Sequence, residues 1–324
     1  MEAAIRAEGL RKRYGDHEAL RGVDVTVPAG EVFGVLGPNG AGKTTTVRIL
    51  STLLVPDGGQ AFVAGHDVVR DPRAVRRAIG LAGQYAAVDE KLTGRENLRL
   101  IGTLYRMGRR TAKARADELL ERFSLQDAAN RVVKTYSGGM RRRLDLAVSI
   151  IAEPAVMFLD EPTTGLDLTS RLALWDMIRE QVARGATVLL TTQYLEEADQ
   201  LADRIAVIDG GLVIAEGTPD ELKAKVGGER LEVSVAHRSD VAAVTALLGR
   251  MVVAPPTTSP DGLTVSVPLH DGFGGVADAA DALRPLGAAV TDFGTRRPSL
   301  DDVFLALTGT TANPERTNAE RTTP

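Results

Sequence analysis

The sequence contains no cysteine, which excludes disulfides, cysteine-based zinc sites and thiol catalysis. The histidines show none of the spacings typical of a metal site; they are His17, His66, His237 and His270. No apolar run reaches the roughly 18 residues of a membrane span, and the longest, 146–159, is interrupted by Glu153-Pro154. The N-terminus lacks the basic and then apolar segments of a signal peptide. We therefore expect a cytoplasmic protein that reaches a membrane only through a partner.

The charge balance is also not that of a nucleic-acid-binding protein. A net charge of -4 argues against such a surface, which needs clustered cations. Short arginine runs at 76–77, 109–110 and 141–143 are more typical of a solvated or partner-facing helix surface. With 324 residues, 44% of them apolar and 25% charged, the chain has room for one large globular domain and a smaller one.

A glycine-rich loop follows the apolar run Val32–Leu36. Its sequence is Gly37-Pro-Asn-Gly-Ala-Gly-Lys43-Thr44. Glycines let backbone N–H groups surround an anion, and the helix that follows adds its positive end. Lys43 is suited to neutralising β- and γ-phosphates, and the Thr44 hydroxyl to binding Mg²⁺. An accidental turn of this pattern is expected in only roughly a few per cent of chains this long, so the loop indicates a nucleoside triphosphate.

A second apolar run, Ala155–Leu159, ends in two acids. Asp160, at the end of the expected strand, is placed to hold Mg²⁺ directly or through water. Glu161, one residue later, is placed to polarise an attacking water. The alternative is a core strand that ends in two solvated acids, which is common. The run resembles the second conserved strand of P-loop ATPases.

Between these two motifs stands Tyr136-Ser-Gly-Gly-Met140, which opens a helix. Ser-Gly-Gly alone is ordinary loop chemistry. In this order and spacing the three motifs resemble the ATP-binding cassette (ABC) ATPases. The resemblance implies an α/β fold: a P-loop NTPase cassette with a RecA-like core, an antiparallel β subdomain and a helical subdomain. It also implies ATP and Mg²⁺ as ligands.

The resemblance assigns roles to individual residues. ATP is held by Gly37, Pro38, Asn39, Gly40, Ala41, Gly42, Lys43, Thr44 and Thr45, with Tyr14 stacking on adenine. Gln84 occupies the place of the family's glutamine loop and, with Thr44 and Asp160, reaches the metal. Ser137, Gly138 and Gly139 face the γ-phosphate held by another subunit. Asp167, in Pro162–Asp167, contacts that opposite subunit. Without the resemblance, a lone Gln would be interpreted as a surface residue and a lone Tyr as a core or surface residue.

The chain departs from the family pattern at three positions. Tyr136 and Met140 replace the usual Leu and Gln, but the Ser and both glycines of the signature are intact. Gln193 stands where a histidine usually bonds the γ-phosphate. Glutamine donates a neutral hydrogen bond and does not titrate near pH 7. We therefore expect Gln193 to act with Lys43 and Glu161 in catalysis, with hydrolysis slower or driven mostly by Glu161.

The pattern along the chain predicts a cassette over 1–227, whose helical subdomain spans about 85–152. Gly227-Gly228 marks a boundary. Residues 228–309 show a strand–helix–strand–strand–helix–strand order, with a strand near Met251, which suggests a small α+β ferredoxin-like domain. A last helix over 300–307 is expected to be capped by Ser299. The polar segment 310–324 predicts a disordered tail.

The signature helix, Gln193 and the ending Pro298–Gly309 resemble the daunorubicin/doxorubicin-resistance type of ATP-binding subunit. This implies a homodimer of ATPase chains on a separate membrane permease, at the cytoplasmic face of the membrane, that powers drug or antibiotic efflux. Export of a lipid, glycan or peptide, a catalytically weak regulatory subunit, and a non-transport ABC ATPase are the alternatives. The last alternative is disfavoured, because non-transport ABC ATPases carry a second cassette or long coiled coils and this sequence shows neither.

Overall fold

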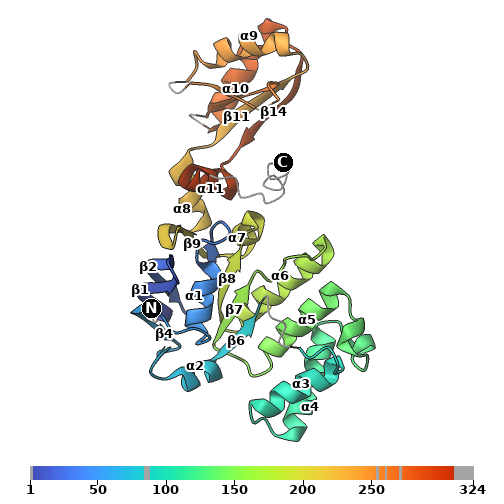
Figure 1. Ribbon diagram of the computed structural model, residues 1–324. Coiled ribbons are helices and arrows are strands. Elements are labelled where there is room, and N and C mark those ends of the chain that lie inside the picture. Colours follow the sequence, from blue (N-terminus) through green and yellow to red (C-terminus); the bar gives the residue numbers. More distant parts are fainter. Residues whose placement is uncertain (1–2, 84–87, 253–254, 260, 270–271, 310–324) are drawn as a thin grey trace, which may run out of the picture. The chain divides into compact units, whose positions relative to one another are not determined.

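The computed structural model describes residues 3–83, 88–252, 255–259, 261–269 and 272–309. The chain forms two compact units, one that extends to Pro219 and one that begins at Asp220 (Figure 1). The domain limits 1–227 and 228–309 stay predictions, and the predicted tail 310–324 lies outside the described residues. Within those residues, no helix combines the length and apolar character needed to cross a bilayer.

A six-stranded sheet, in the order β10-β9-β3-β8-β7-β6, forms the centre of the first unit. Its strands are β3 (Val32–Leu36), β6 (Ile79–Ala82), β7 (Val156–Asp160), β8 (Thr187–Thr192), β9 (Arg204–Asp209) and β10 (Leu212–Gly217). β10 pairs antiparallel with β9, and all other neighbours are parallel. Every residue of β3, β7 and β8 is buried, as continuous apolar runs predict for strands covered on both faces.

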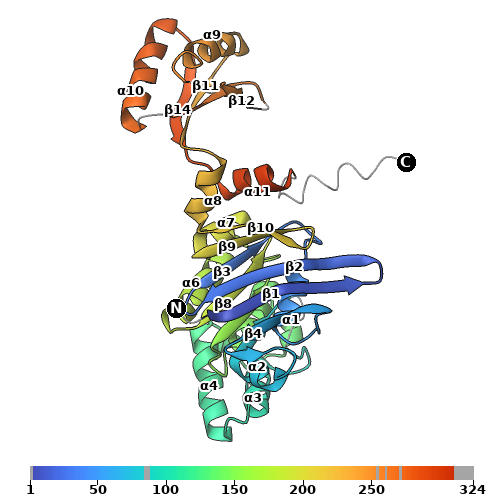
Figure 2. The same ribbon diagram turned by 90° about the vertical axis from the view of Figure 1, so that its left-hand side faces the viewer.

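A four-stranded antiparallel sheet, in the order β2-β1-β4-β5, lies beside the central sheet (Figure 2). Its strands are β1 (Ala3–Tyr14), β2 (His17–Pro28), β4 (Gly58–Val63) and β5 (His66–Asp67), with α1 (Lys43–Leu50) and α2 (Pro72–Ala78) nearby. One core joins this sheet, α1 and one face of the central sheet, where Phe33 and Phe158 are fully buried. The other face of the central sheet packs on the helices, through Met157 and Leu159.

The helical region predicted in the middle of the chain is confirmed for the described residues. It contains α3 (Gly94–Leu104), α4 (Arg109–Arg122), α5 (Gly138–Ser149) and two short 3-10 helices, η1 (Gln126–Ala128) and η2 (Val133–Thr135). Thr93 and Glu96 form the capping box that their spacing predicts. α6 (Leu168–Ala183) and α7 (Leu195–Leu201) complete the unit. The predicted α/β cassette fold is therefore present.

The second unit is a four-stranded antiparallel sheet in the order β12-β13-β11-β14. Its elements are α8 (Pro219–Val226), β11 (Arg230–Val235), α9 (Arg238–Leu248), β12 (Thr257–Thr258), β13 (Thr264–Pro268), α10 (Gly272–Leu283), η3 (Arg284–Leu286), β14 (Val290–Arg296) and α11 (Leu300–Thr308). The strand and helix order is the predicted one, and the ferredoxin-like label stays our interpretation of it. Ser299 caps α11 and forms a capping box with Asp302.

Two local predictions are wrong. Of the residues described there, 251–252 and 255–256, none forms a strand: Met251 lies in a turn after α9, and the next described strand, β12, begins at Thr257. The apolar run there ends in Pro255-Pro256, which cannot donate to a strand ladder, and Val252 instead packs against the core from the loop. The helical spacing of Val47, Leu50 and Leu54 also predicts a helix from Lys43 that continues past Leu54 and stops before Pro56, but the helix ends at Leu50. Thr52 has a φ of 65°, so the chain turns there, and Leu54 packs from the turn.

Candidate functional site

The glycine-rich loop connects the end of β3 to α1, and the surrounding backbone leaves no room for side chains at two of its glycines. A Cβ at Gly37 would lie 2.1 Å from the carbonyl oxygen of Ile208. Gly42 has a φ of 112°, and its Cβ would lie 2.6 Å from the Leu20 side chain. The loop is therefore pressed against β9 and β2, and its tip, Asn39-Gly40, is exposed.

Lys43, the first residue of α1, is 5% exposed. Its ammonium donates to the carbonyl oxygens of Gly37, at 2.8 Å, and Pro38, at 3.1 Å. Burial lowers the pKa of Lys43, and the negative charges of Glu161 and Asp160 oppose that shift. The lysine and the two acids therefore lie close enough to interact electrostatically.

Asp160 and Thr44 meet across the gap between β7 and α1. The Thr44 hydroxyl donates to Asp160 Oδ1 at 3.2 Å, and the Thr191 hydroxyl donates to the same oxygen at 2.5 Å. Hydroxyl and carboxylate oxygens are ligands that Mg²⁺ prefers. Among the described residues no three acidic, His or Cys side chains gather around a metal position. The donor set fits a magnesium ion that takes its remaining ligands from phosphate and water.

The strand register places Glu161 and Gln193 at one edge of the sheet. Asp160 on β7 pairs with Thr191 on β8, and Thr192 pairs with Leu36 at the entrance to the loop. The N–H of Glu161 donates to the carbonyl oxygen of Thr191 at 3.0 Å. Glu161 has a φ of 49°, in the left-handed region where residues with a side chain are uncommon. The chain therefore turns away from the direction of β7 at Glu161 itself, the candidate catalytic residue.

The signature segment opens α5, as predicted. The Ser137 side chain caps this helix by accepting from the N–H of Met140 at 3.2 Å. Ser137 and Gly138 are exposed, and a Cβ at Gly138 would meet no atom within 4 Å. A Cβ at Gly139, in contrast, would lie 2.8 Å from Ser170 Oγ at the start of α6. The N-terminal end of α5 is therefore open at Gly138 and closed by α6 at Gly139.

Asp167 and Tyr14, two other predicted residues, have simpler surroundings. Asp167 caps α6 by accepting from the N–H of Ser170 at 2.7 Å, and this bond lowers the pKa of Asp167. Tyr14 lies at the end of β1 and is 45% exposed, which leaves its ring open to a stacking partner. Gln84 lies outside the described residues.

Arg142, on α5, is a site residue that the sequence reasoning missed. Its guanidinium donates to the carbonyl oxygens of Pro162 at 2.6 Å, Glu161 at 2.9 Å and Gly83 at 2.8 Å. The interpretation of residues 141–143 as a solvated or partner-facing surface is wrong for this residue, whose side chain is 16% exposed. Its position one turn before the buried Asp145, at 3.6 Å, is the signal that could have identified it.

Glu197, on α7, is a second missed residue and is fully buried. It accepts from the indole N–H of Trp175 at 3.2 Å. Burial raises the pKa of Glu197, and the hydrogen bond from Trp175 opposes the shift. This carboxyl therefore connects α7 to α6 inside the core.

Glu197→Gln is expected to remove part of the pH dependence of stability. Because the folded-state pKa is raised, the stability that Glu197 contributes is complete below its unfolded pKa of about 4.3 and is lost as pH rises through the folded value. The free energy of unfolding of the Gln variant, relative to the wild type, should therefore increase from acid to neutral pH. Urea titrations followed by the single tryptophan, Trp175, measure it.

The matched control is Glu196→Gln, because Glu196 is exposed and lies on the same helix. The free energy of unfolding of this variant, relative to the wild type, should not show the increase from acid to neutral pH that is expected for Glu197→Gln. Parallel pH profiles for the wild type and the Glu197→Gln variant would contradict a raised pKa at this carboxyl.

Comparisons with known proteins agree with this geometry. A family model described as ABC transporter matches residues 20–164. A solved structure, an ATP binding subunit of an ABC transporter, is 29% identical with a TM-score of 0.64, over 68% of this chain and 92% of that one. The daunorubicin resistance ATP-binding protein DrrA3 of Streptomyces coeruleorubidus is 57% identical over 95% of this chain and 96% of its own length. The daunorubicin/doxorubicin resistance ATP-binding protein DrrA of Streptomyces peucetius is 51% identical over 97% and 95%.

The fold and the assembled loop, acids and signature helix define an ATP-binding subunit of an ABC transporter, an ABC-type ATPase. Within this class, the identity along nearly the whole chain is decisive. The chain belongs to the family of daunorubicin/doxorubicin resistance ATP-binding proteins.

Proposed function

We propose that the chain binds MgATP between the glycine-rich loop and the ends of β7 and β8. Lys43 neutralises the β- and γ-phosphates, and Thr44, with Asp160, holds Mg²⁺, which would supply charge neutralisation at the phosphates. Glu161 accepts a proton from the attacking water. The observation that carries this proposal is the convergence of Lys43, Thr44, Asp160 and Glu161. Thr45 and Tyr14 are assigned to the nucleotide, and Gln84 to the metal, by family position.

We further propose that two copies form two shared sites. The exposed N-terminal end of α5, with Ser137 and Gly138, offers N–H groups and the positive helix end to a phosphate held by a second copy. Gly139 and Asp167 belong to the same surface. The exposed position of Ser137 supports this arrangement.

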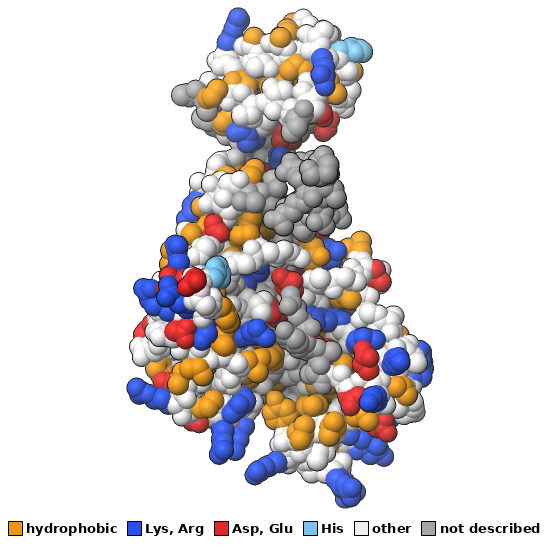
Figure 3. Space-filling view, viewed as in Figure 1, with side chains coloured by type: hydrophobic (Ala, Val, Ile, Leu, Met, Phe, Trp, Pro, Cys, Tyr) orange, Lys and Arg blue, Asp and Glu red, His pale blue; other side chains and the backbone are white. Residues whose placement is uncertain are grey.

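A permease subunit is the proposed membrane partner. Large hydrophobic side chains of the first unit are exposed on α3, at Leu100 and Leu104, and after α1, at Leu53 and Val55. Figure 3 shows hydrophobic side chains gathered on the lower part of this unit, where α3 lies. Leu104 and Val55 are 68% and 63% exposed, which is costly for a surface that stays in water. Docking here would hold the chain at the cytoplasmic face of the membrane.

The proposed cargo is a drug or antibiotic, because the relatives at 57% and 51% identity are daunorubicin and doxorubicin resistance proteins. A second candidate is export of a different cargo, a lipid, glycan or peptide. The Nod factor export ATP-binding protein I of Rhizobium meliloti, 39% identical over 94% of this chain, supports it more weakly.

The test is efflux from a drug-sensitive bacterium that expresses the chain together with the membrane protein encoded beside its gene. We expect daunorubicin to leave these cells faster than cells that carry the Lys43→Ala variant at equal abundance. If both strains accumulate daunorubicin equally although the unmutated chain hydrolyses ATP, daunorubicin is not the cargo, and export of the second candidate cargo remains.

Gln193 provides a separate prediction. If its amide bonds the γ-phosphate, Gln193→Ala is expected to reduce the ATP hydrolysis rate by roughly tenfold while ATP affinity changes less. Gln193→His should stay active and acquire a dependence on pH near the imidazole pKa of about 6.5. Steady-state kinetics across pH measure both effects.

Gln200→Ala, at an exposed position on α7, is the control and should hydrolyse ATP like the wild type. Wild-type turnover in the Gln193→Ala variant would show that position 193 takes no part in the reaction.

A further inference from the structure

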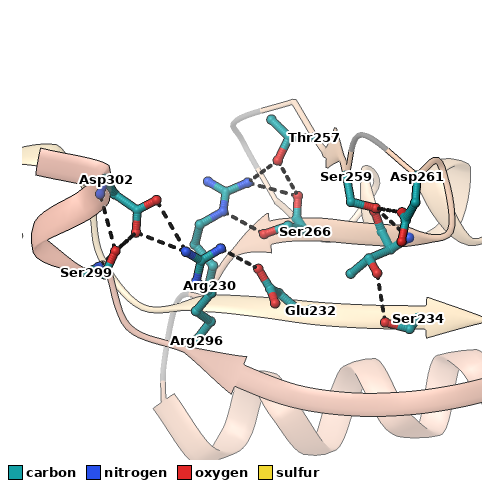
Figure 4. A network of polar contacts seen from close by, with 11 residues as sticks. Arg230, Glu232, Ser234, Thr257, Ser259, Asp261, Ser266, Arg296, Ser299 and Asp302 are labelled. Atoms are coloured by element: carbon teal, nitrogen blue, oxygen red, sulfur yellow. Dashed lines mark hydrogen bonds and ion pairs between the residues drawn. The ribbon is translucent and has the colours of Figure 1, made fainter. Parts of the chain in front are cut away.

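The second unit has a polar sheet face that the nucleotide chemistry does not use. Along β11, Leu231 and Val233 belong to the core that includes α9 and α10, whereas Arg230 and Glu232 lie on the opposite face. Figure 4 shows this face, where Arg230 from β11 and Arg296 from β14 lie close together. Side chains from β12, β13 and the start of α11 surround them.

A hollow of about 360 Å³ lies over this face. Its lining carries three guanidinium groups, from Arg230, Arg296 and Arg297, and two carboxylates, from Glu232 and Asp302. The hydroxyls of Thr257, Thr258, Ser259, Thr264 and Ser266 complete the lining. The hollow therefore has a net positive charge and many adaptable hydrogen-bond partners.

Arg230 is held in place entirely by neutral groups. Its Nε donates to Ser266 Oγ at 2.7 Å, and its Nη2 donates to Thr257 Oγ1 at 2.8 Å and to the Ser266 carbonyl oxygen at 2.9 Å. Within the described part of the chain, no carboxylate lies within 4.0 Å of this guanidinium. The side chain is therefore fixed while its charge is not neutralised.

Arg296 and Arg297 differ from Arg230 in this respect. Arg296 contacts Asp302 at 3.3 Å and Glu232 at 3.5 Å, so its charge is shared between two acids. Arg297 is 85% exposed and lies 3.7 Å from Glu229. The excess positive charge of the hollow is thus located at Arg230, and Arg297, which also lines the hollow, pairs with Glu229.

We propose that this hollow binds a small molecule that carries an oxyanion group, a carboxylate or a phosphate. A fixed guanidinium without a carboxylate partner presents the planar donors that such groups accept. The volume falls within the range of small-molecule sites and exceeds what a bare oxyanion fills, so the hydroxyls would bind the rest of the ligand. This hollow shares no residue with the nucleotide site, and the proposal does not depend on the proposed cargo.

The experiment measures binding of inorganic phosphate and of citrate to the full chain by isothermal titration calorimetry. It uses the Lys43→Ala background, because the glycine-rich loop also attracts phosphate. We expect one of the two anions to bind, and Arg230→Gln to weaken that binding by roughly tenfold or more, since hydrogen bonds to charged groups are the stronger class. Thr257→Val, which removes one anchor and no charge, should weaken it less.

The matched control is Arg284→Gln, which removes the same charge from an exposed arginine in η3 that pairs with Asp281. It should leave binding unchanged. Three results would overturn the proposal: no heat from either anion, equal affinity in the Arg230→Gln and parent proteins, or equal losses in the Arg230→Gln and Arg284→Gln proteins. Thr257→Val retains the guanidinium, so a folded protein is available if Arg230→Gln does not fold.

Discussion

Replacing Glu161 with glutamine is expected to reduce ATP hydrolysis by at least about a hundredfold and to leave ATP binding nearly intact. Glutamine has the same shape as glutamate but cannot accept a proton from water. The contacts that fix the local backbone, from the N–H of residue 161 to Thr191, involve no side-chain carboxyl and remain. Single-turnover hydrolysis and equilibrium binding of ATP measure the two effects separately.

Glu153→Gln is the matched control, because Glu153 also has a positive φ, of 52°, but its side chain is 75% exposed and pairs with Arg115. It should hydrolyse ATP at the wild-type rate. Loss of ATP binding in the Glu161→Gln variant, or unchanged turnover, would remove Glu161 from the role of proton acceptor.

The same variant tests the proposed pairing of two copies. If Ser137 and Gly138 contact a phosphate bound to the second copy, unhydrolysed ATP should hold the dimer together. Size-exclusion chromatography with light scattering should then show a dimer for Glu161→Gln with ATP and a monomer without it. A protein that binds ATP and stays monomeric would contradict the shared site without affecting the assignment of Glu161.

The features that could be predicted from the sequence are those that depend on residues close to one another along the chain. Gly37 and Gly42 have no space for a side chain, and strand β7 is buried on both faces, so each leaves a pattern in consecutive residues. The caps at Ser137 and Thr93 depend on groups three residues away. Such features were placed to within a residue or two.

The errors and omissions come from contacts between distant segments. An apolar side chain fills a core equally well from a loop or from a regular element. Val252 and Leu54 pack from loops, which is why the sequence predicted a strand near Met251 and a helix that extends to Leu54. The three consecutive arginines look alike in sequence apart from the acid at position 145, three residues after Arg142, and it is the packing of α5 against the loop after β7 that buries Arg142 there. Glu197 likewise had no local sign of its burial.

Replacing Arg142 is also expected to slow ATP hydrolysis strongly. Its guanidinium joins the signature helix to the backbone carbonyl oxygens of Gly83, Glu161 and Pro162. It therefore positions Glu161 through the backbone of that residue and not through the Glu161 side chain. Arg142→Gln is expected to lower kcat by roughly 10- to 100-fold, because hydrogen bonds from a charged group contribute about 1.5–3 kcal/mol. KM for ATP should change much less, since Lys43 and its loop are not contacted.

The adjacent Arg141 provides the control. It pairs with the exposed Glu90 at 2.7 Å, so Arg141→Gln removes the same charge from the same helix and should retain most of kcat. Arg142→Lys, which keeps the charge but not the planar set of donors, should lie between the Gln variant and the wild type. Thermal unfolding distinguishes a positioning effect from a loss of stability caused by removing the ion pair between Arg142 and Asp145.

A double-mutant cycle with Glu161 decides how Arg142 acts. If Arg142 works by holding Glu161, then Arg142→Gln should cause little further loss of hydrolysis in the Glu161→Gln background, because the group it positions is already inactive. Additive losses in the two backgrounds would mean that Arg142 supports another part of the site. The burial of its side chain and its bonds to the loop that carries Glu161 favour the non-additive outcome.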